Sequence, residues 1–382
     1  ALIKLGQDLL SEVWLGDKVE TGTPVVILSA SAPADSLDDT ASRTAVRVSE
    51  PYGGEPYLDT VPITPLPAEA PEGSVPVAAA QPAPVAADRP VYDFDLVVLG
   101  AGPGGYTAAF RAADLGLSVA LVERNPTLGG VCLNVGCIPS KALLHAARVI
   151  EDAQAMGEHG IRFGAPQVDA PRLRAWKDSV VARLTGGLET LARQRKVTVI
   201  RGVAEFASPH ELQVDAADGS RRVSFAQCIV AAGSEPLRLP GWPDDPRVID
   251  STGALELELP ESLLVVGGGI IGLEMATVYA ALGVRVSVVE LTSGLMPGCD
   301  RDLVRPLEKR IAGRYERILL GTRVTSVEPL ADGLRVTFEG DSAPEPQVYG
   351  KVLLAVGRTP NGKRLGAAAA GVHVDERGFI PV

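Results

Sequence analysis

The sequence predicts an α/β protein with two Rossmann-like domains, preceded by a small β segment and a Pro/Ala-rich linker. A strand, a glycine turn, a helix, a second strand and a glutamate follow one another at residues 95–123, and the same order returns at residues 262–290. The composition agrees, because 41 glycines and only 4% aromatic residues suit tight turns between strands and helices. A length of 382 residues allows two or three domains.

Charge and hydropathy exclude several classes of partner. The formal net charge is −11 and no basic block occurs, which argues against nucleic acid and against an anionic membrane surface. No apolar run reaches the roughly 20 residues of a membrane span, and no signal peptide opens the chain. We therefore expect a cytoplasmic protein, in which a cysteine pair is catalytic or metal-binding rather than a structural disulfide.

Residues 1–30 read as a small β segment. Short strands are expected at residues 13–15 and 24–28, and the turn between them resembles the closing half of a lipoyl domain. Lys18 lies in that turn and is expected to be a solvated lysine rather than a carrier of a lipoyl group. Residues 31–90 are rich in Pro and Ala without apolar periodicity, which predicts a disordered linker that serves as a semi-stiff arm or as an incidental spacer.

The first Rossmann-like domain is expected at residues 91–238. The apolar strand 95–99 runs into Gly100, Gly102 and Gly105, which form a GxGxxG turn before a helix. In this pattern the first glycine makes the tight turn, the second lets a pyrophosphate approach the backbone, and the third lets helix and strand pack closely. Glu123 ends the next strand and would accept hydrogen bonds from a ribose.

Cys132 and Cys137 follow within fourteen residues of Glu123. On a regular helix their Cα atoms would lie about 8–9 Å apart, whereas a disulfide spans roughly 4.4–6.8 Å. A bridge therefore needs a distorted turn, for which Gly136 and Pro139 are suitable, and such a bridge would be easily reduced. The alternatives are two buried thiols or a zinc site, and the latter lacks ligands beyond His145, so we expect no metal.

The chain then alternates helix and strand. The expected elements are helices at 138–155 and 173–195, and strands at 197–200, 211–214, 222–225 and 228–232. Cys228 is expected to be a small core residue.

The second Rossmann-like domain is expected at residues 239–360. Strand 263–266 precedes Gly267, Gly269 and Gly272, and Glu290 ends the next strand. A second such unit predicts a second dinucleotide, and the absence of Arg or Lys just after Glu290 favours NAD over NADP. A helix at 301–311 and strands at 323–328, 334–338 and 351–356 follow, and residues 361–382 begin a return to the first domain.

Residues 130–141, GVCLNVGCIPSK, resemble the redox-disulfide signature of the flavoprotein disulfide reductases, most closely the dihydrolipoamide dehydrogenases. The resemblance extends from about residue 92 to residue 382. It implies FAD in the first domain, NAD in the second, and oxidation of the dihydrolipoyl groups of 2-oxo acid dehydrogenase complexes.

The resemblance also implies roles for single residues. Cys132 would exchange with the dithiol substrate, Cys137 would face the flavin as a thiolate, and Lys141 would pair with Glu274 beside the flavin. Glu274 has the alternative of being an ordinary polar residue on a helix face. The implied FAD contacts are Gly100, Gly102, Gly105, Glu123, Arg124, Thr127, Gly129, Gly130, Cys132, Lys141, Ala204 and Gly233. The implied NAD contacts are Gly267, Gly269, Ile270, Ile271, Gly272, Glu290, Val324, Ala355, Gly357 and Arg358.

The chain departs from the family pattern at its end. A further FAD contact, the catalytic histidine with its glutamate, and the domain that makes a homodimer are expected beyond residue 382. None of the four histidines of this chain is followed by glutamate at the family's spacing. The rival interpretations are a related reductase of glutathione or mercuric ion, and a binding or assembly fragment without complete catalytic machinery.

Overall fold

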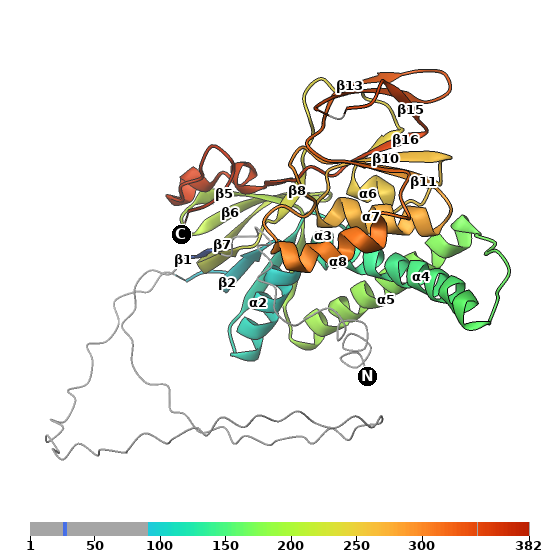
Figure 1. Cartoon of the computed structure of the whole chain (residues 1–382). Helices are drawn as coiled ribbons and strands as arrows, with labels where there is room; N and C mark the ends of the chain where they lie inside the picture. The colour runs from blue at the N-terminus through green and yellow to red at the C-terminus, as the bar shows by residue number, and fades with distance from the viewer. Residues whose placement is uncertain (1–25, 29–90, 342, 382) are drawn as a thin grey trace, which may run out of the picture. The chain divides into compact units, whose positions relative to one another are not determined.

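The computed structural model of the chain describes residues 26–28, 91–341 and 343–381 (Figure 1). The expected strand at 13–15, Lys18 and the linker at 31–90 lie outside these residues. Among the described helices, none has the length and apolarity needed to cross a membrane.

The first sheet is formed by seven strands, in the order β4–β3–β2–β7–β6–β5 with β1 also paired to β7. Strands β2, β3 and β4 and the end of β7 run parallel, whereas β5, β6 and the start of β7 are antiparallel. The strands are β1 (Val26–Leu28), β2 (Phe94–Leu99), β3 (Val119–Glu123), β4 (Thr198–Arg201), β5 (Val203–Ser208), β6 (Glu211–Ala216) and β7 (Gly219–Val230).

Strand β2 is the centre of this sheet because its apolar residues are buried on both faces. Two reciprocal Asp–Ser pairs fix its start. The Asp93 carboxylate accepts from the Ser224 amide and hydroxyl at 2.8 Å each. The Asp95 carboxylate accepts from the Ser118 amide and hydroxyl at 2.8 and 2.7 Å. Because Ser224 is in β7 and Ser118 precedes β3, these pairs hold β2 in register with both neighbours.

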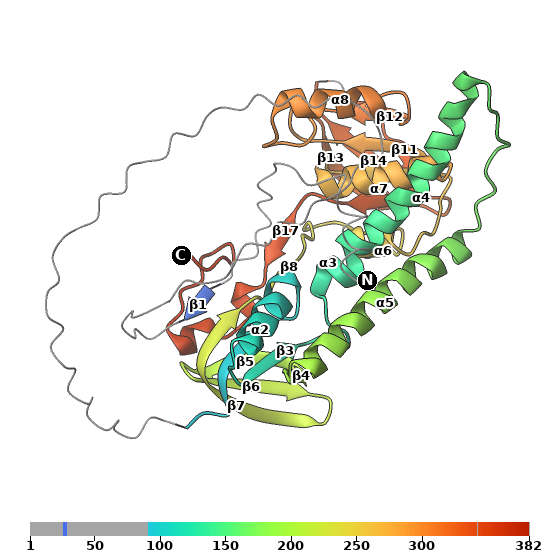
Figure 2. The same ribbon diagram turned by 90° about the horizontal axis from the view of Figure 1, so that it is seen from below.

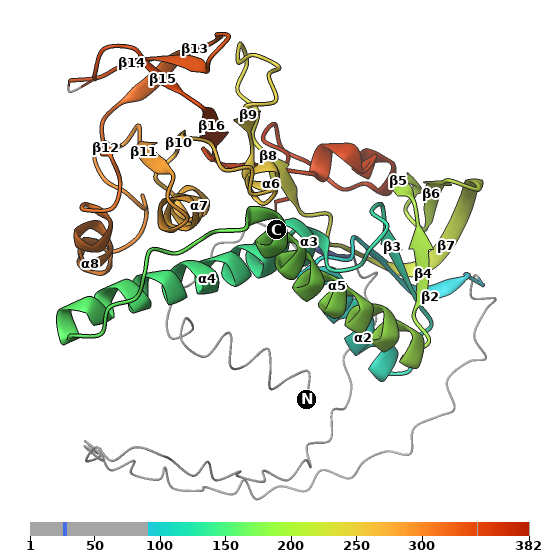
Figure 3. The same cartoon turned by 90° about the vertical axis from the view of Figure 1, so that its right-hand side faces the viewer.

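Helices pack beside this sheet and extend away from it. Helix α2 (Pro103–Asp114) lies against β2 and β3 (Figure 2). The short helix α3 (Gly130–Val135) is followed by α4 (Cys137–Ala155), the 3₁₀ turn η1 (Met156–His159) and α5 (Ala170–Gln194). Helix α4 passes along α7 (Ile270–Ala281), which belongs to the second Rossmann-like unit (Figure 3).

The second parallel sheet has the order β12–β11–β10–β16–β9. An antiparallel sheet, β13–β14–β15, is inserted before its strand β16. The remaining elements of this unit are β9 (Val248–Ile249), α6 (Ser251–Ala254), β10 (Ser262–Val266), β11 (Arg285–Val289), α8 (Arg301–Ile311), β12 (Arg317–Leu319), β13 (Arg323–Pro329), β14 (Leu334–Glu339), β15 (Gln347–Tyr349) and β16 (Lys351–Leu354).

A two-stranded ribbon joins the two units. Strand β8 (Ser234–Pro236) leaves the first sheet and pairs antiparallel with β17 (Arg358–Pro360), which leaves the second. The chain then passes through η2 (Gly362–Arg364) and η3 (Ala367–Ala370), and Leu365, Ala367 and Ile380 join the core of the first sheet.

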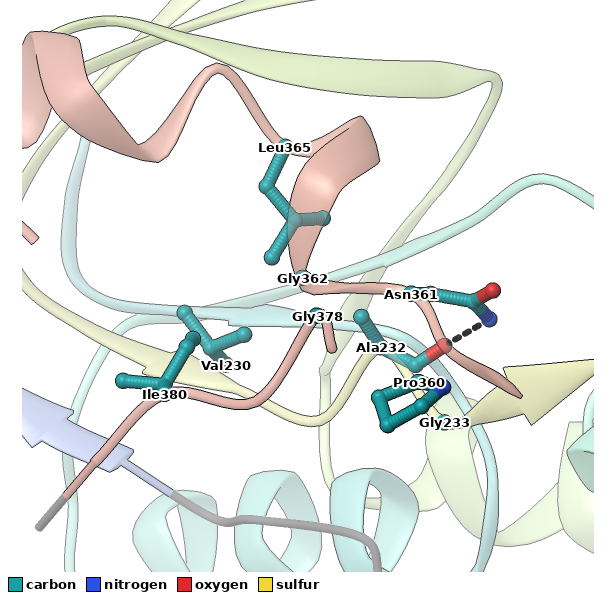
Figure 4. A pocket seen from close by; sticks show the side chains of 9 residues that line it. All are labelled: Val230, Ala232, Gly233, Pro360, Asn361, Gly362, Leu365, Gly378 and Ile380. Carbon is teal, nitrogen blue, oxygen red and sulfur yellow. Dashed lines mark hydrogen bonds between the residues drawn. The ribbon is translucent and has the colours of Figure 1, made fainter. Parts of the chain in front are cut away.

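A small cavity lies where this returning segment meets the end of β7 (Figure 4). The Asn361 side-chain amide donates to the carbonyl of Ala232 at 2.8 Å at its edge. A cavity of about 10 Å³ holds one water molecule at most, so it is a packing defect rather than a substrate site.

Most of the expected helices and strands are present, and several short elements were not predicted. The helix expected at 301–311 has those bounds, and Cys228 is buried in β7 with 1% of its surface exposed. The helix expected at 138–155 starts one residue earlier. Strands β5, β8, β9, β12, β15 and β17 and helices α3 and α6 were not predicted, because two to six residues carry little periodicity. Equally short strands such as β4 and β16 were predicted because they carry apolar runs.

Candidate active site

The two cysteines lie at a break between two helices. Helix α3 carries Cys132 and ends at Gly136, whose φ of −145° and ψ of −116° are not helical, and α4 begins at Cys137. The expected distortion is therefore present. A Cβ on residue 136 would lie 2.9 Å from the Val131 carbonyl oxygen, so the break favours glycine. Both cysteines are free thiols, Cys132 half-buried and Cys137 exposed.

The environment shifts the pKa values of the two thiols in opposite directions. The Cys132 thiol donates a hydrogen bond to the Cys137 sulfur, which lowers the pKa of Cys137 to about 6, and the Lys141 ammonium lowers it further against the effect of burial. The same hydrogen bond, together with burial, raises the pKa of Cys132. Cys137 also begins a 19-residue helix, where the positive end of the helix dipole stabilises a thiolate. Cys137 is therefore the stable thiolate of the pair.

Lys141 pairs with Glu274 as expected. Lys141 lies in α4 and Glu274 in α7, so this ion pair bridges the two units. The buried Ser140 hydroxyl lies 3.0 Å from the other carboxylate oxygen of Glu274 and 3.0 Å from the carbonyl oxygen of Cys137. Ser140 was not singled out from the sequence, although its place beside Lys141 puts it on the same helical turn.

Asn134 holds the turn that precedes Cys137. Its side-chain amide donates to the carbonyl of Leu128 at 3.1 Å and to that of Gly130 at 2.9 Å. Its side-chain oxygen accepts from the Thr127 hydroxyl at 2.8 Å. The expected FAD contact Thr127 thus also supports the cysteine turn. Asn134 was missed, and its position between the cysteines was the only signal for it.

The first glycine turn packs directly on the cysteine turn. A Cβ on Gly105 would lie 1.7 Å from the carbonyl oxygen of Gly100, and one on Gly130 would lie 2.5 Å from the Cα of Gly102. The Gly129 amide donates to the carbonyl of Ala101 at 2.8 Å. The two loops therefore touch through their backbones, and only glycine permits this approach.

The second glycine turn repeats this geometry. Gly267 has a φ of +113°, and a Cβ there would lie 2.4 Å from the Ala355 oxygen, just as one on Gly100 would lie 2.3 Å from the Ala231 oxygen. A Cβ on Gly272 would lie 2.2 Å from the Gly267 oxygen. The internal duplication seen in the sequence therefore extends to single backbone contacts.

Both turns have the features that a dinucleotide pyrophosphate requires. Gly102 and Gly269 are the N-cap residues of helices α2 and α7 and provide no side-chain cap, which leaves first-turn amides for a ligand. A Cβ on Gly269 would meet no atom within 4 Å, and one on Gly102 would meet only Gly130, at 3.9 Å. The space over both turns is thus open on the side from which a phosphate would approach.

Other expected contacts lie in different settings. Arg124 pairs with Glu235 at 2.8 Å, and the guanidinium of Arg358 donates to the Ser234 hydroxyl at 2.8 Å, so both charges are engaged with strand β8. Ala204 is buried in β5, and Val324 lies half-buried in β13. Gly233 lies between β7 and β8, directly before Ser234, and Gly357 lies between β16 and β17, directly before Arg358. Ile270 is exposed and Ile271 half-buried in the first turn of α7.

Comparison with known proteins identifies the family. Residues 94–382 match the family described as pyridine nucleotide-disulphide oxidoreductase. The chain belongs to this family. Dihydrolipoyl dehydrogenases of this family use FAD and NAD.

Curated relatives and a solved structure also resemble this chain. The chain is 56% identical over 290 residues to the dihydrolipoyl dehydrogenase of Vibrio cholerae and 53% identical to that of Haemophilus influenzae. Each match covers 75% of this chain, and the chain spans only 61% and 60% of those relatives. The Cu(II) complex of the flavoprotein disulfide reductase RclA from Escherichia coli has a TM-score of 0.66 and 30% identity, with 76% of this chain and 63% of RclA covered.

The pKa of Cys137 predicts how alkylation depends on pH. Because this thiol ionises near pH 6, iodoacetamide should modify Cys137 at a rate that rises through pH 6 and levels off by about pH 7.5. Cys132, whose pKa is raised, should react much more slowly over this range. Mass spectrometry of the reduced chain measures both sites, with exposed Cys299 as a reference. A Lys141→Met variant should shift the Cys137 midpoint upward, and an unchanged midpoint would contradict the role of the ammonium.

Proposed function

We propose that the protein oxidises protein-bound dihydrolipoyl groups through the Cys132–Cys137 pair, FAD and NAD⁺. The observation that carries the proposal is the cysteine turn itself. It places a stabilised thiolate at the start of α4, beside Lys141, with its backbone against the first glycine turn. The identity to named dihydrolipoyl dehydrogenases supports the same substrate.

The dithiol exchange starts from the oxidised pair. A substrate thiolate attacks the Cys132 sulfur, the bond between Cys132 and Cys137 breaks, and Cys137 leaves as a thiolate. The second substrate thiol, once deprotonated, attacks the substrate sulfur held by Cys132. This forms the cyclic disulfide of the lipoyl group and releases Cys132, which takes up a proton. The substrate has lost two electrons and two protons, and the cysteine pair holds both electrons.

The residues around the pair set the direction of attack. The lower pKa makes Cys137 the better leaving group, which directs the substrate to Cys132. Lys141 stabilises the departing thiolate, and Glu274 pairs with Lys141 while accepting a hydrogen bond from the Ser140 hydroxyl on its other oxygen. When bound, FAD accepts the two electrons and supplies hydride transfer to NAD⁺.

The two glycine turns would hold these cofactors. The first turn, Glu123 and the residues from Arg124 to Gly130 would bind FAD, with Ala204 and Gly233 beyond them. The second turn and Glu290 would bind NAD, with Val324 and Ala355–Arg358 beyond them. Open space over Gly102 and Gly269 and the uncapped helix starts support this assignment.

The setting of the reaction follows from the same proposal. The partners are the lipoyl-bearing components of 2-oxo acid dehydrogenase complexes, the full-length enzyme is a homodimer, and the reaction takes place in the cytoplasm. A reducing compartment suits a cysteine pair that must cycle between thiol and disulfide forms.

A comparison of donors and thiols tests the proposal. The FAD-loaded chain, oxidised at the cysteines, should lose its visible flavin absorbance with NADH at least tenfold faster than with NADPH, because Glu290 opposes a 2′-phosphate. Dihydrolipoamide should reduce the Cys132–Cys137 disulfide, which is measured as two new thiols per chain. Reduced glutathione at the same thiol concentration should reduce a much smaller fraction of this disulfide. Preference for NADPH and glutathione would assign the chain to the glutathione-reducing branch.

A further inference from the structure

The two ribose-binding acids are held by the same set of hydrogen bonds. In the first unit, Glu123 Oε2 accepts from the Ala101 amide at 2.8 Å, and Oε1 accepts from the Asn125 amide at 2.9 Å and side chain at 2.7 Å. In the second unit, Glu290 Oε2 accepts from the Gly268 amide at 2.7 Å. Its Oε1 accepts from the Thr292 amide and hydroxyl, both at 2.8 Å.

Counting acceptor sites shows what remains for a ligand. A carboxylate accepts about four hydrogen bonds, two on each oxygen. In both units Oε1 is fully used and Oε2 has one site left. Both acids are buried, with 5% and 8% of their surface exposed, so this last site has a fixed direction. It is on the oxygen that also holds the glycine turn.

The residues that occupy Oε1 are exposed side chains two positions after each acid. Asn125 and Thr292 bury little apolar surface, so packing does not explain their orientation. The Thr292 hydroxyl has one hydrogen and two acceptors, Glu290 Oε1 and the Gly294 carbonyl at 2.9 Å. The charged carboxylate is the stronger acceptor and takes the hydrogen.

We propose that Asn125 and Thr292 are positioning residues that occupy the outer oxygen of each acid and thereby direct the one remaining acceptor site at a single ribose hydroxyl. The inference rests on the proposed binding of a dinucleotide at each turn. Without the side-chain donor, Oε1 keeps only the backbone amide as an anchor, so the carboxylate is held less firmly and its remaining site on Oε2 is no longer fixed toward the ribose hydroxyl. The turn then still forms, but its preference for a 2′-hydroxyl over a 2′-deoxy sugar declines.

The second site offers a direct test with AMP and 2′-deoxy-AMP. FAD-loaded chain, in which the first site is filled, is titrated with each nucleotide by calorimetry. We expect the unmodified chain to prefer AMP by on the order of tenfold, the effect of one hydrogen bond to a charged group. Thr292→Val should reduce this preference to about twofold by weakening AMP alone, and Thr292→Ser should retain it. Thr198→Val, which alters an exposed threonine in β4, is the matched control and should change neither affinity.

The possible failures can be distinguished. Equal weakening of AMP and 2′-deoxy-AMP by Thr292→Val would show a merely structural role and overturn the inference, as would an unchanged preference. Lack of binding by AMP and NADH to the unmodified, FAD-loaded chain would overturn the proposed function of the second turn and the inference with it. In the FAD-free chain, Asn125→Leu should weaken FAD binding by a factor comparable to the loss of AMP affinity in Thr292→Val. Unchanged FAD binding in this variant would contradict the role proposed for Asn125.

Discussion

Replacing Cys132 with serine is expected to abolish electron transfer from dihydrolipoamide while FAD stays bound. The serine oxygen cannot form the disulfide that the substrate thiolate attacks, so no mixed disulfide forms. Flavin reduction by dihydrolipoamide should slow at least a thousandfold, equivalent to about 4 kcal/mol of transition-state stabilisation. Stopped-flow absorbance of the FAD-loaded protein measures this rate, and the protein-bound flavin spectrum measures FAD retention.

Two comparisons make the Cys132 result specific. Cys299→Ser changes an exposed cysteine in another loop and should leave the rate unchanged. NADH should still reduce the flavin of the Cys132→Ser protein, because that half of the reaction does not use the disulfide. A Cys132→Ser protein that accepts electrons from dihydrolipoamide at the normal rate would refute the proposed function.

Gly105→Ala is expected to disrupt the first glycine turn and to lose FAD. Its new Cβ would lie 1.7 Å from the carbonyl oxygen of Gly100, a contact that forces α2 away from β2. Overpacking against backbone should lower the free energy of unfolding by about 3 kcal/mol or more. Thermal denaturation and the FAD content after gel filtration measure the two effects.

Substitutions at two other glycines distinguish a loss of packing from a blocked approach of the ligand. Gly186→Ala, at an exposed helical position with no atom within 4 Å, should be neutral or stabilising by about 0.5–1 kcal/mol. Gly102→Ala should leave the stability of the FAD-free chain nearly unchanged, since its Cβ would meet only Gly130 at 3.9 Å, but it should weaken FAD binding. A stable Gly105→Ala protein that retains FAD would show that the glycine turn can accommodate a Cβ at residue 105 and would contradict this prediction.

The sequence predicted the features that depend on local pattern. Two glycine turns with their acids follow from spacing alone, because only glycine fits the backbone approaches seen at Gly105 and Gly272. The pairing of Lys141 with Glu274 could not follow from spacing, because 132 residues separate the two. It came from the family resemblance, and the packing of α4 on α7 then accounts for it.

Residues that act through hydrogen bonds to the backbone were missed for a physical reason. Asn134 and Ser140 bond to carbonyl groups of the cysteine turn, and those groups are oriented only once the helix breaks at Gly136. Asn125 and Thr292 follow their acids by two positions, which is a pattern visible in the sequence. This pattern points to a shared role only once the structure shows that Glu123 and Glu290 accept the same kind of side-chain hydrogen bond from these two residues.

The ion pair between α4 and α7 has a consequence for the charge at Cys137. Lys141 lies one turn after Cys137, and Glu274 lies one turn into α7. The Lys141 ammonium lowers the pKa of Cys137, whereas the Glu274 carboxylate raises it. The charge at this sulfur therefore depends on a residue of each Rossmann-like unit and on the packing of α4 against α7.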